Sequence, residues 1–264
     1  MRTYRTLFII TTMIAIGIVG CSQKPADGTA VAAVLDSAAV AVHDSAAVAV
    51  ADSAVVVAAT DSLAATPDDT DRYSKLTDAD FSKVADELGV EVAALRAVVE
   101  IEAGREQTGF VAPGKPVINF DRSVFRRNLS KAGIATGKYK GNAALGGGNA
   151  RKTGYANAQW ARLEAGRLID RDIANKSTFW GMFQIGGFNW HKCGCKSVEE
   201  FVEKMCYSEE SQLELMAEFM KSTGLVKHLK NHNWRQFALI YNGPSGLRRG
   251  YHTRLARAYA KYKR

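Results

Sequence analysis

The sequence predicts a mainly α-helical domain with a small β component, preceded by an export signal and a low-complexity segment. Apolar residues recur at helical spacing in several segments after residue 72, and residues 117–120 have the pattern of a short strand. Residues 1–21 have the charge and apolar pattern of a secretory signal. Residues 24–71 contain no aromatic side chain. The chain of 264 residues therefore has room for one domain of ordinary size after these segments.

The N-terminal segment, residues 1–21, predicts export and lipid anchoring. Its apolar run, residues 7–19, follows two arginines and is too short for a comfortable membrane span. The ending Ile18-Val19-Gly20-Cys21 resembles the lipobox of bacterial lipoproteins, in which the cysteine becomes the lipidated first residue. We therefore expect Cys21 to anchor the protein in the cell envelope, and the non-acidic Ser22 favours the outer membrane, facing the periplasm. The alternative is an uncleaved signal anchor or a simple signal peptide.

Residues 22–72 predict a disordered linker. Asp-Ser pairs recur with Ala and Val between them, at Asp36, Asp44, Asp52 and Asp61. Side chains this small bury too little surface to offset the entropy of ordering the chain. The alternative is a β-solenoid or an aggregating Val-rich arm, but the regular aspartates argue against stacking.

Charge separates this linker from the predicted domain, residues 73–264. Residues 1–72 hold four basic side chains and eight aspartates, so the formal +8 of the whole chain leaves +12 on the domain. A basic surface suits polyanions, and those near an exported protein are peptidoglycan, with its peptide carboxylates, and lipid head groups. Export disfavours nucleic acid as a partner. We expect a monomer.

The cysteines and the glycines point to no cofactor or metal. Cys193, Cys195 and Cys206 allow at most one internal disulfide. The alternative is a zinc site that also uses His191, but Cys-x-Cys is not the usual two-residue metal knuckle. The Gly-rich residues 141–154 predict a surface loop, because no strand leads into them as a phosphate-binding motif requires.

The domain is predicted to contain a series of helices. The first opens with a capping-box pattern at Thr77 and Asp80 and stops at Gly89, and the second starts near Glu91. Later helices are predicted over residues 155–171, 197–205, 208–222 and 234–241.

Glu102 lies on the apolar face of the second predicted helix. At about 100° per residue, it shares one narrow sector with Leu95, Val98 and Val99. Glu100 points well away from this sector. An isolated charge on a core face is costly, so a carboxyl there tends to have a raised pKa, as a general acid at neutral pH requires. The alternative is a glutamate in a frayed last turn that bends into water.

Three segments in order resemble the lysozyme superfamily. They are Glu102-Ala103-Gly104, Trp180-Gly181-Met182-Phe183-Gln184-Ile185 and Ile240-Tyr241-Asn242-Gly243-Pro244. In goose-type lysozymes and lytic transglycosylases, a catalytic glutamate ends a helix, a Gly-Leu-Met-Gln-type segment lines the cleft and an Ala-Tyr-Asn segment closes it. From about Leu76 to the C-terminus the chain is more similar to the N-acetylmuramidase domain of phage endolysins and bacterial cell-wall enzymes, through residues 94–102, 177–189, 241–244 and 253–256.

This resemblance implies a lysozyme-like α+β domain that cleaves peptidoglycan with Glu102 as general acid. The bond would be the β-1,4 bond between N-acetylmuramic acid and N-acetylglucosamine. The family usually has Ser at the position of Ala103 and Phe-Glu-Arg where this chain has Phe120-Asp121-Arg122. Asp121 is therefore the candidate second carboxylate by family position, with Asp170 and Asp172 behind it.

Two alternatives to hydrolysis with two carboxylates remain open. If no second carboxylate is placed, the substrate's N-acetyl group or 6-hydroxyl supplies the nucleophile, the latter in a lytic transglycosylase. The protein could also be a non-catalytic peptidoglycan-binding lipoprotein, against which the retained Glu102 argues.

Four residues are candidates for substrate binding: Phe183, Gln184, Tyr241 and Asn242. The amides of Gln184 and Asn242 need partners beside an apolar cluster and can bind the N-acetyl and hydroxyl groups of a sugar. Tyr241 offers a sugar-stacking face and a hydroxyl close to Glu102. Phe183 and its apolar neighbours also fit plain core packing, and residues 241–244 also fit a helix-ending turn.

We predict that Cys21→Ala releases the protein from membranes or stalls its processing, because no other segment is long and apolar enough to hold it. Membrane fractionation and the mass of the N-terminal peptide measure the effect. Unchanged fractionation, with no lipid mass on Cys21 of the unsubstituted chain, would contradict lipid anchoring.

Overall fold

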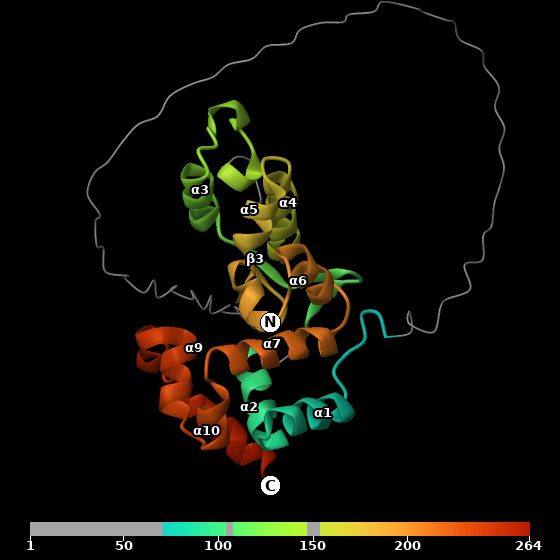
Figure 1. Ribbon diagram of the computed structural model, residues 1–264, viewed down its shortest axis with the longest axis vertical. Helices are drawn as coiled ribbons and strands as arrows, with labels where there is room; N and C mark the ends of the chain where they lie inside the picture. The colour runs from blue at the N-terminus through green and yellow to red at the C-terminus, as the bar shows by residue number, and fades with distance from the viewer. Residues whose placement is uncertain (1–70, 104–107, 147–153) are drawn as a thin grey trace, which may run out of the picture. The chain divides into compact units, whose positions relative to one another are not determined.

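The computed structural model describes residues 71–103, 108–146 and 154–264 (Figure 1). The predictions for the export signal, for Cys21 and for the linker up to residue 70 lie outside these residues, as does half of the Gly-rich stretch. Helices predominate among the described residues and the strands are short, which confirms the predicted fold class. No helix in these ranges is long and apolar enough to cross a membrane.

The described part begins with the two predicted helices, α1 (Asp78–Leu88) and α2 (Val92–Ala103). The capping box forms as predicted, because the Thr77 side chain accepts a hydrogen bond from the Asp80 amide and the Asp80 carboxylate accepts one from the Thr77 amide at 2.7 Å. Gly89 ends α1 in the left-handed conformation. Both helices bury their predicted apolar faces and pack against each other.

A small antiparallel sheet lies in the middle of the sequence. It has three strands in the order β3 (Ile118–Phe120), β4 (Thr178–Trp180) and β5 (Ile185–Gly186). β3 is the predicted strand, and its Ile118 pairs with Trp180. A two-stranded hairpin of β1 (Phe110–Ala112) and β2 (Lys115–Pro116) precedes it. Strands this short depend on the surrounding helices for their stability.

The described residues between 121 and 176 form α3 (Arg122–Lys131), α4 (Tyr155–Arg167) and α5 (Arg171–Lys176), with short 3-10 turns at Gly137–Tyr139 and Ala143–Leu145. The single helix predicted over residues 155–171 is wrong at its end. Leu168 is 83% exposed, and Asp170 caps α5 by accepting a hydrogen bond from the Ile173 amide at 2.7 Å. An aspartate satisfies a free amide at a helix start, which explains the break.

The C-terminal part is helical throughout. After a 3-10 segment, η5 (Gly187–Cys193), come α6 (Val198–Met205), α7 (Glu209–Ser222), α8 (Val226–Lys230), α9 (Trp234–Arg248) and α10 (Tyr251–Tyr262). Ser197 and Ser208 cap α6 and α7, so the predicted starts of these helices are confirmed. α9 continues past its predicted end, and the helices α3, α8 and α10 were not predicted.

α9 bends at the Tyr-Asn-Gly-Pro segment instead of ending there. Gly243 has φ 66° and ψ −175°, which is not helical, and Pro244 opens the second half of the helix. Proline suits this place because it has no amide hydrogen to bond to the preceding turn. The predicted helix-ending turn is therefore a break that leaves Asn242 at the end of one helical half.

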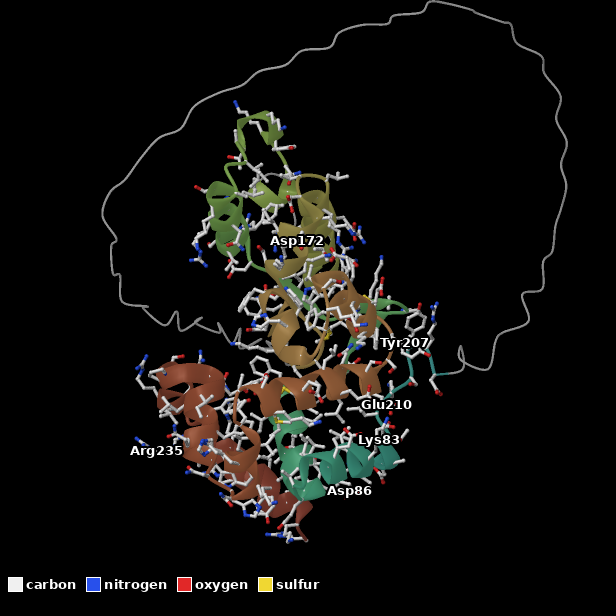
Figure 2. All side chains as sticks on the ribbon, viewed as in Figure 1. Lys83, Asp86, Asp172, Tyr207, Glu210 and Arg235 are labelled. Atoms are coloured by element: carbon white, nitrogen blue, oxygen red, sulfur yellow. The ribbon has the colours of Figure 1, made fainter. Side chains whose placement is uncertain are left out.

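α7 is the central helix of the described domain. It packs against α1 on one side and against α6 and η5 on another (Figure 1). Lys83 of α1 forms surface ion pairs with Glu210 at 2.7 Å and Glu214 at 2.8 Å (Figure 2). Exposed pairs of this kind contribute little, so the buried face of α7 is what holds these elements together.

Two buried polar side chains at the start of α7 bind backbone groups of distant segments. Glu209 accepts hydrogen bonds from the Gly109 amide at 2.7 Å and the Leu76 amide at 3.0 Å. Gln212 accepts one from the Met182 amide at 2.9 Å. These bonds satisfy buried amides that the sheet and helices leave free, and they fix the segment before α1, the start of β1 and the turn between β4 and β5.

We predict that Gly181→Ala lowers the free energy of unfolding by about 2–4 kcal/mol. Gly181 has φ 69°, and a Cβ there would lie 2.7 Å from Gln212 Oε1 and 2.8 Å from Met205 Sδ, so backbone strain and overpacking add. Gly133→Ala is the matched control, because Gly133 has φ 70° and no atom within 4 Å of such a Cβ. It should lose only about 1–2 kcal/mol. Denaturant unfolding measures both, and equal losses would show that the Gln212 contact is unimportant.

Candidate active site

Glu102 lies in the last turn of α2, on the face that the helix buries. Leu95, Val98 and Val99 are buried on the same face, as the periodicity predicts. α2 makes its most extensive packing with α10. Glu102 keeps some exposure as a residue, but its Oε1 atom is buried and has no hydrogen-bond partner. The carboxyl is thus held in an apolar setting at the edge of solvent.

Burial controls the protonation of this carboxyl. It holds the pKa of Glu102 well above its ordinary value, and this effect outweighs the Asn242 amide and the positive charge of Arg254, which both lower that pKa. Glu100, two residues earlier, has its pKa lowered because Lys261 and Tyr262 hydrogen-bond to it. Of the two glutamates, only Glu102 is therefore suited to carry a proton near neutral pH.

Asn242 is the side chain that lowers the pKa of Glu102 most. It is 3% exposed, and neither Nδ2 nor Oδ1 has a well-formed hydrogen bond with any described residue. Its contact with the Glu102 carboxyl is close enough to lower the pKa but falls short of good hydrogen-bond geometry. Gly246 makes room for it, since a Cβ there would lie 2.4 Å from the Asn242 Cβ. A buried amide without a partner is the expected state of a group that binds a ligand.

Tyr241 and Phe183 are inside the core. The Tyr241 hydroxyl donates a hydrogen bond to the Phe183 carbonyl at 3.1 Å, and its ring packs against Phe219 and Phe237 at centroid distances of 6.1 and 5.8 Å. Burial, followed by the nearby Glu102, raises the Tyr241 pKa. Tyr241 is 5% exposed and Phe183 is fully buried, so the predicted sugar-stacking face is covered. Both residues shape the wall behind Glu102 rather than presenting an aromatic surface.

Gln184 occupies the turn between β4 and β5 in a left-handed conformation with φ 49°. Its Nε2 donates to the Gly181 carbonyl at 2.8 Å and to the Val117 carbonyl at 3.4 Å. The donor half of this amide therefore stabilises the turn. The residue is half-buried, and its role in substrate binding stays a prediction.

The three candidates for a second carboxylate each have a partner elsewhere. Asp121 caps α3 by accepting hydrogen bonds from two backbone amides at 2.8 and 3.0 Å, and Asp170 caps α5. Asp172 pairs with Lys176 at 2.6 Å on the surface (Figure 2). None of the three is among the groups that shift the pKa of Glu102. The assignment of Asp121 as second carboxylate stays a prediction.

Sequence reasoning missed Arg254. It belongs to the segment 253–256 that carries the family resemblance, yet only the structure brings its charge near Glu102, through the packing of α10 on α2. The cysteines Cys193, Cys195 and Cys206 are free thiols. Within the described ranges, no group of three His, Cys, Asp or Glu residues is arranged to hold a metal ion.

The helical fold with its small sheet is that of a lysozyme-like glycosidase. The family model described as N-acetylmuramidase matches residues 91–263, so the chain belongs to the N-acetylmuramidase family. A solved structure described as a Burkholderia AP3 phage endolysin is similar, with a TM-score of 0.61 and 36% identity over 72% of this chain and 71% of that chain. No curated protein matches significantly.

We predict that Glu102→Gln stabilises the fold near pH 8 by about 1–3 kcal/mol, because the amide removes the penalty of a buried unpaired charge. The pKa of the native Glu102 carboxyl is raised. Its contribution to the stability of the parent protein is therefore fully present below pH 4.5 and is lost as the pH rises through the raised pKa. The gain should therefore vanish at about pH 4.

Glu100→Gln is the control with the opposite sign. The pKa of Glu100 is lowered, so its contribution is present above pH 4.5 and is lost as the pH falls. This variant should be slightly less stable than the parent at neutral pH. Thermal unfolding between about pH 4 and pH 8 measures both, and a pH-independent effect of Glu102→Gln would show that its carboxyl is not protonated by burial.

Proposed function

We propose that this protein is an N-acetylmuramidase that cleaves the β-1,4 bond between N-acetylmuramic acid and N-acetylglucosamine in peptidoglycan, with Glu102 as general acid. Family membership supports peptidoglycan as the substrate. The observation that carries the assignment of Glu102 is its Oε1 atom, buried without a partner, on a carboxyl whose pKa burial raises. Such a carboxyl is protonated at the pH where a glycosidic oxygen needs a proton.

Cleavage of a glycosidic bond requires at least one group that donates a proton. Positive charge builds on the sugar ring as the glycosidic bond breaks, and the leaving oxygen must take a proton from the enzyme. Glu102 donates it and becomes a carboxylate, which Asn242 and Arg254 then stabilise, since both favour the charged form. The free amide of Asn242 also suits an N-acetyl or hydroxyl group of the bound sugar.

A lytic transglycosylase reaction is the second candidate. The observation that favours it is the engagement of Asp121, Asp170 and Asp172 in two helix caps and an ion pair. Without a second free carboxylate, the 6-hydroxyl of the substrate can act as nucleophile. Mass spectrometry of digested peptidoglycan separates the two reactions, because hydrolysis gives reducing ends and transglycosylation gives anhydro ends that lack one water.

The location of the activity is also a proposal. Cys21 would anchor the protein in the outer membrane, and residues 22–72 would tether the domain to reach the wall. A flexible chain of that length has a typical span of roughly 35–40 Å. The basic charge of residues 73–264 favours contact with the acidic wall polymer.

We predict that Glu102→Gln lowers cleavage of purified peptidoglycan about 100- to 10,000-fold, because the amide has nearly the same shape and cannot deliver a proton. Release of soluble fragments and new chain ends measures this. Glu100→Gln on the same helix should keep its activity, because Glu100 pairs with Lys261 at the surface. An active Glu102→Gln protein would refute the catalytic assignment, and an inactive parent protein would favour a binding lipoprotein.

A further inference from the structure

Arg254 is a basic side chain near Glu102, and the proposed reaction assigns it only a minor role. It lies on α10, which packs against both α2 and α9, the helices that carry Glu102 and Asn242. Its charge is felt at Glu102, yet the two side chains form no ion pair within 4 Å. The guanidinium therefore stands beside the candidate acid without neutralising it.

One face of this guanidinium contacts an aromatic ring. Its central carbon lies 5.2 Å from the centre of the Tyr251 ring, one helical turn earlier on α10, so a cation–π contact holds it. Its Nε atom is buried and has no hydrogen-bond partner among the described residues. The residue as a whole is half-buried, so part of its side chain remains accessible to solvent.

Two cations near the end of this helix form ion pairs at the surface. Lys261 binds Glu100 at 2.7 Å and Lys263 binds Glu91 at 2.8 Å. Arg254 has no acidic partner of this kind in the described ranges. A buried donor without a partner weakens the free protein. These features make sense if an anion completes the arginine fork when substrate binds.

The groups around the guanidinium leave that role to the substrate. The Glu102 carboxyl of α2 lies near enough to feel its charge, and α9, which also packs on α10, places Asn242 beside that carboxyl. The guanidinium's own helix contributes Tyr251 and His252, whose Nδ1 atom is also buried without a partner. Arg254 is the charged group that acts on Glu102, and burial of Glu102 raises its pKa, which favours the neutral carboxyl.

We propose that Arg254 binds a carboxylate of the glycan substrate beside the bond that Glu102 protonates, and thereby makes the enzyme selective for acidic glycan strands. The inference rests on the proposed function. A planar fork is suited to a carboxylate, which it binds through two parallel hydrogen bonds. The carboxylate comes from one of two sources: the lactyl group of N-acetylmuramic acid that carries no stem peptide, or a stem peptide. A bound anion also offsets the positive charge next to Glu102 and so favours its acid form.

The test compares cleavage of two soluble substrates, glycan strands without stem peptides and glycan strands with them. Each is used with free carboxylates and after conversion of the carboxylates to neutral methylamides. For the source that Arg254 recognises, the parent protein should lose about 10- to 100-fold in kcat/KM on amidation, mostly through KM. Arg254→Gln should cleave the free and amidated forms with the same low efficiency.

Two variants serve as controls. Arg257→Gln removes an exposed charge three residues away on α10 and should keep the full preference for carboxylates. Arg254→Lys keeps the charge without the fork and should keep part of the preference, which covers the case in which Arg254→Gln does not fold.

Two outcomes would overturn the inference about Arg254. One is a parent protein indifferent to amidation of both substrates, and the other is an Arg254→Gln protein that still prefers the carboxylate forms. Failure of the proposed function looks different, since the parent protein would then cleave none of the four substrates, or Glu102→Gln would cleave them all.

Discussion

The buried side chain of Gln212 on α7 connects the segments that surround the candidate site. Its Oε1 accepts from the Met182 amide at 2.9 Å, and its Nε2 donates to the Met205 carbonyl at 2.9 Å and to the Gly109 carbonyl at 3.4 Å. These groups belong to the turn after β4, the end of α6 and the residue before β1. The Met182 amide and the Met205 carbonyl would each be a buried backbone group without a partner if Gln212 were apolar, whereas the Gly109 carbonyl also accepts a bond from the Val117 amide. One amide thus ties the turn beside Tyr241, the end of α6 and the start of β1 to the same helix.

The described domain uses its polar groups in two ways. In the framework some are satisfied, as with Glu209, which is buried and accepts two backbone amides, although Asn175 Nδ2 has no partner. Around Glu102 they are not: Glu102 Oε1, both Asn242 amide atoms and Arg254 Nε are buried without well-formed bonds. Unsatisfied buried groups lower stability, so a rigid framework is needed to hold them in place. Their concentration at the end of α2 distinguishes a site for a polar ligand from the ordinary core.

The break in α9 leaves Asn242 at the end of the first helical half. Gly243 adopts a conformation that favours glycine, and Pro244 restarts the helix in a new direction. The absence of a Cβ at Gly246 then lets the second half of the helix approach Asn242. A straight helix would direct its next residues elsewhere, and α10 would not reach α2. The Tyr-Asn-Gly-Pro segment therefore contributes geometry as well as an amide.

The sequence by itself determined the local features and the family. The capping box at Thr77, the serine caps, the strand at residues 118–120 and the apolar face with Glu102 all follow from short-range patterns, because caps and periodicity act within a few residues. The three spaced segments also predicted the lysozyme-like fold through their resemblance to that family. The helices α3, α8 and α10 were not predicted, and each buries only one to three side chains.

Only the tertiary structure decided which residues meet. The Tyr241 ring packs against Phe237 of its own helix and against Phe219 of α7, and only the latter contact depends on tertiary packing. Asp121 caps α3 through one carboxylate oxygen, and its role as second carboxylate stays a prediction. Arg254 lies about 150 residues from Glu102 in the chain, and no pattern in the sequence joins them. Their proximity arises from the packing of α10 on α2, an interaction between distant segments that depends on the shape of the whole core.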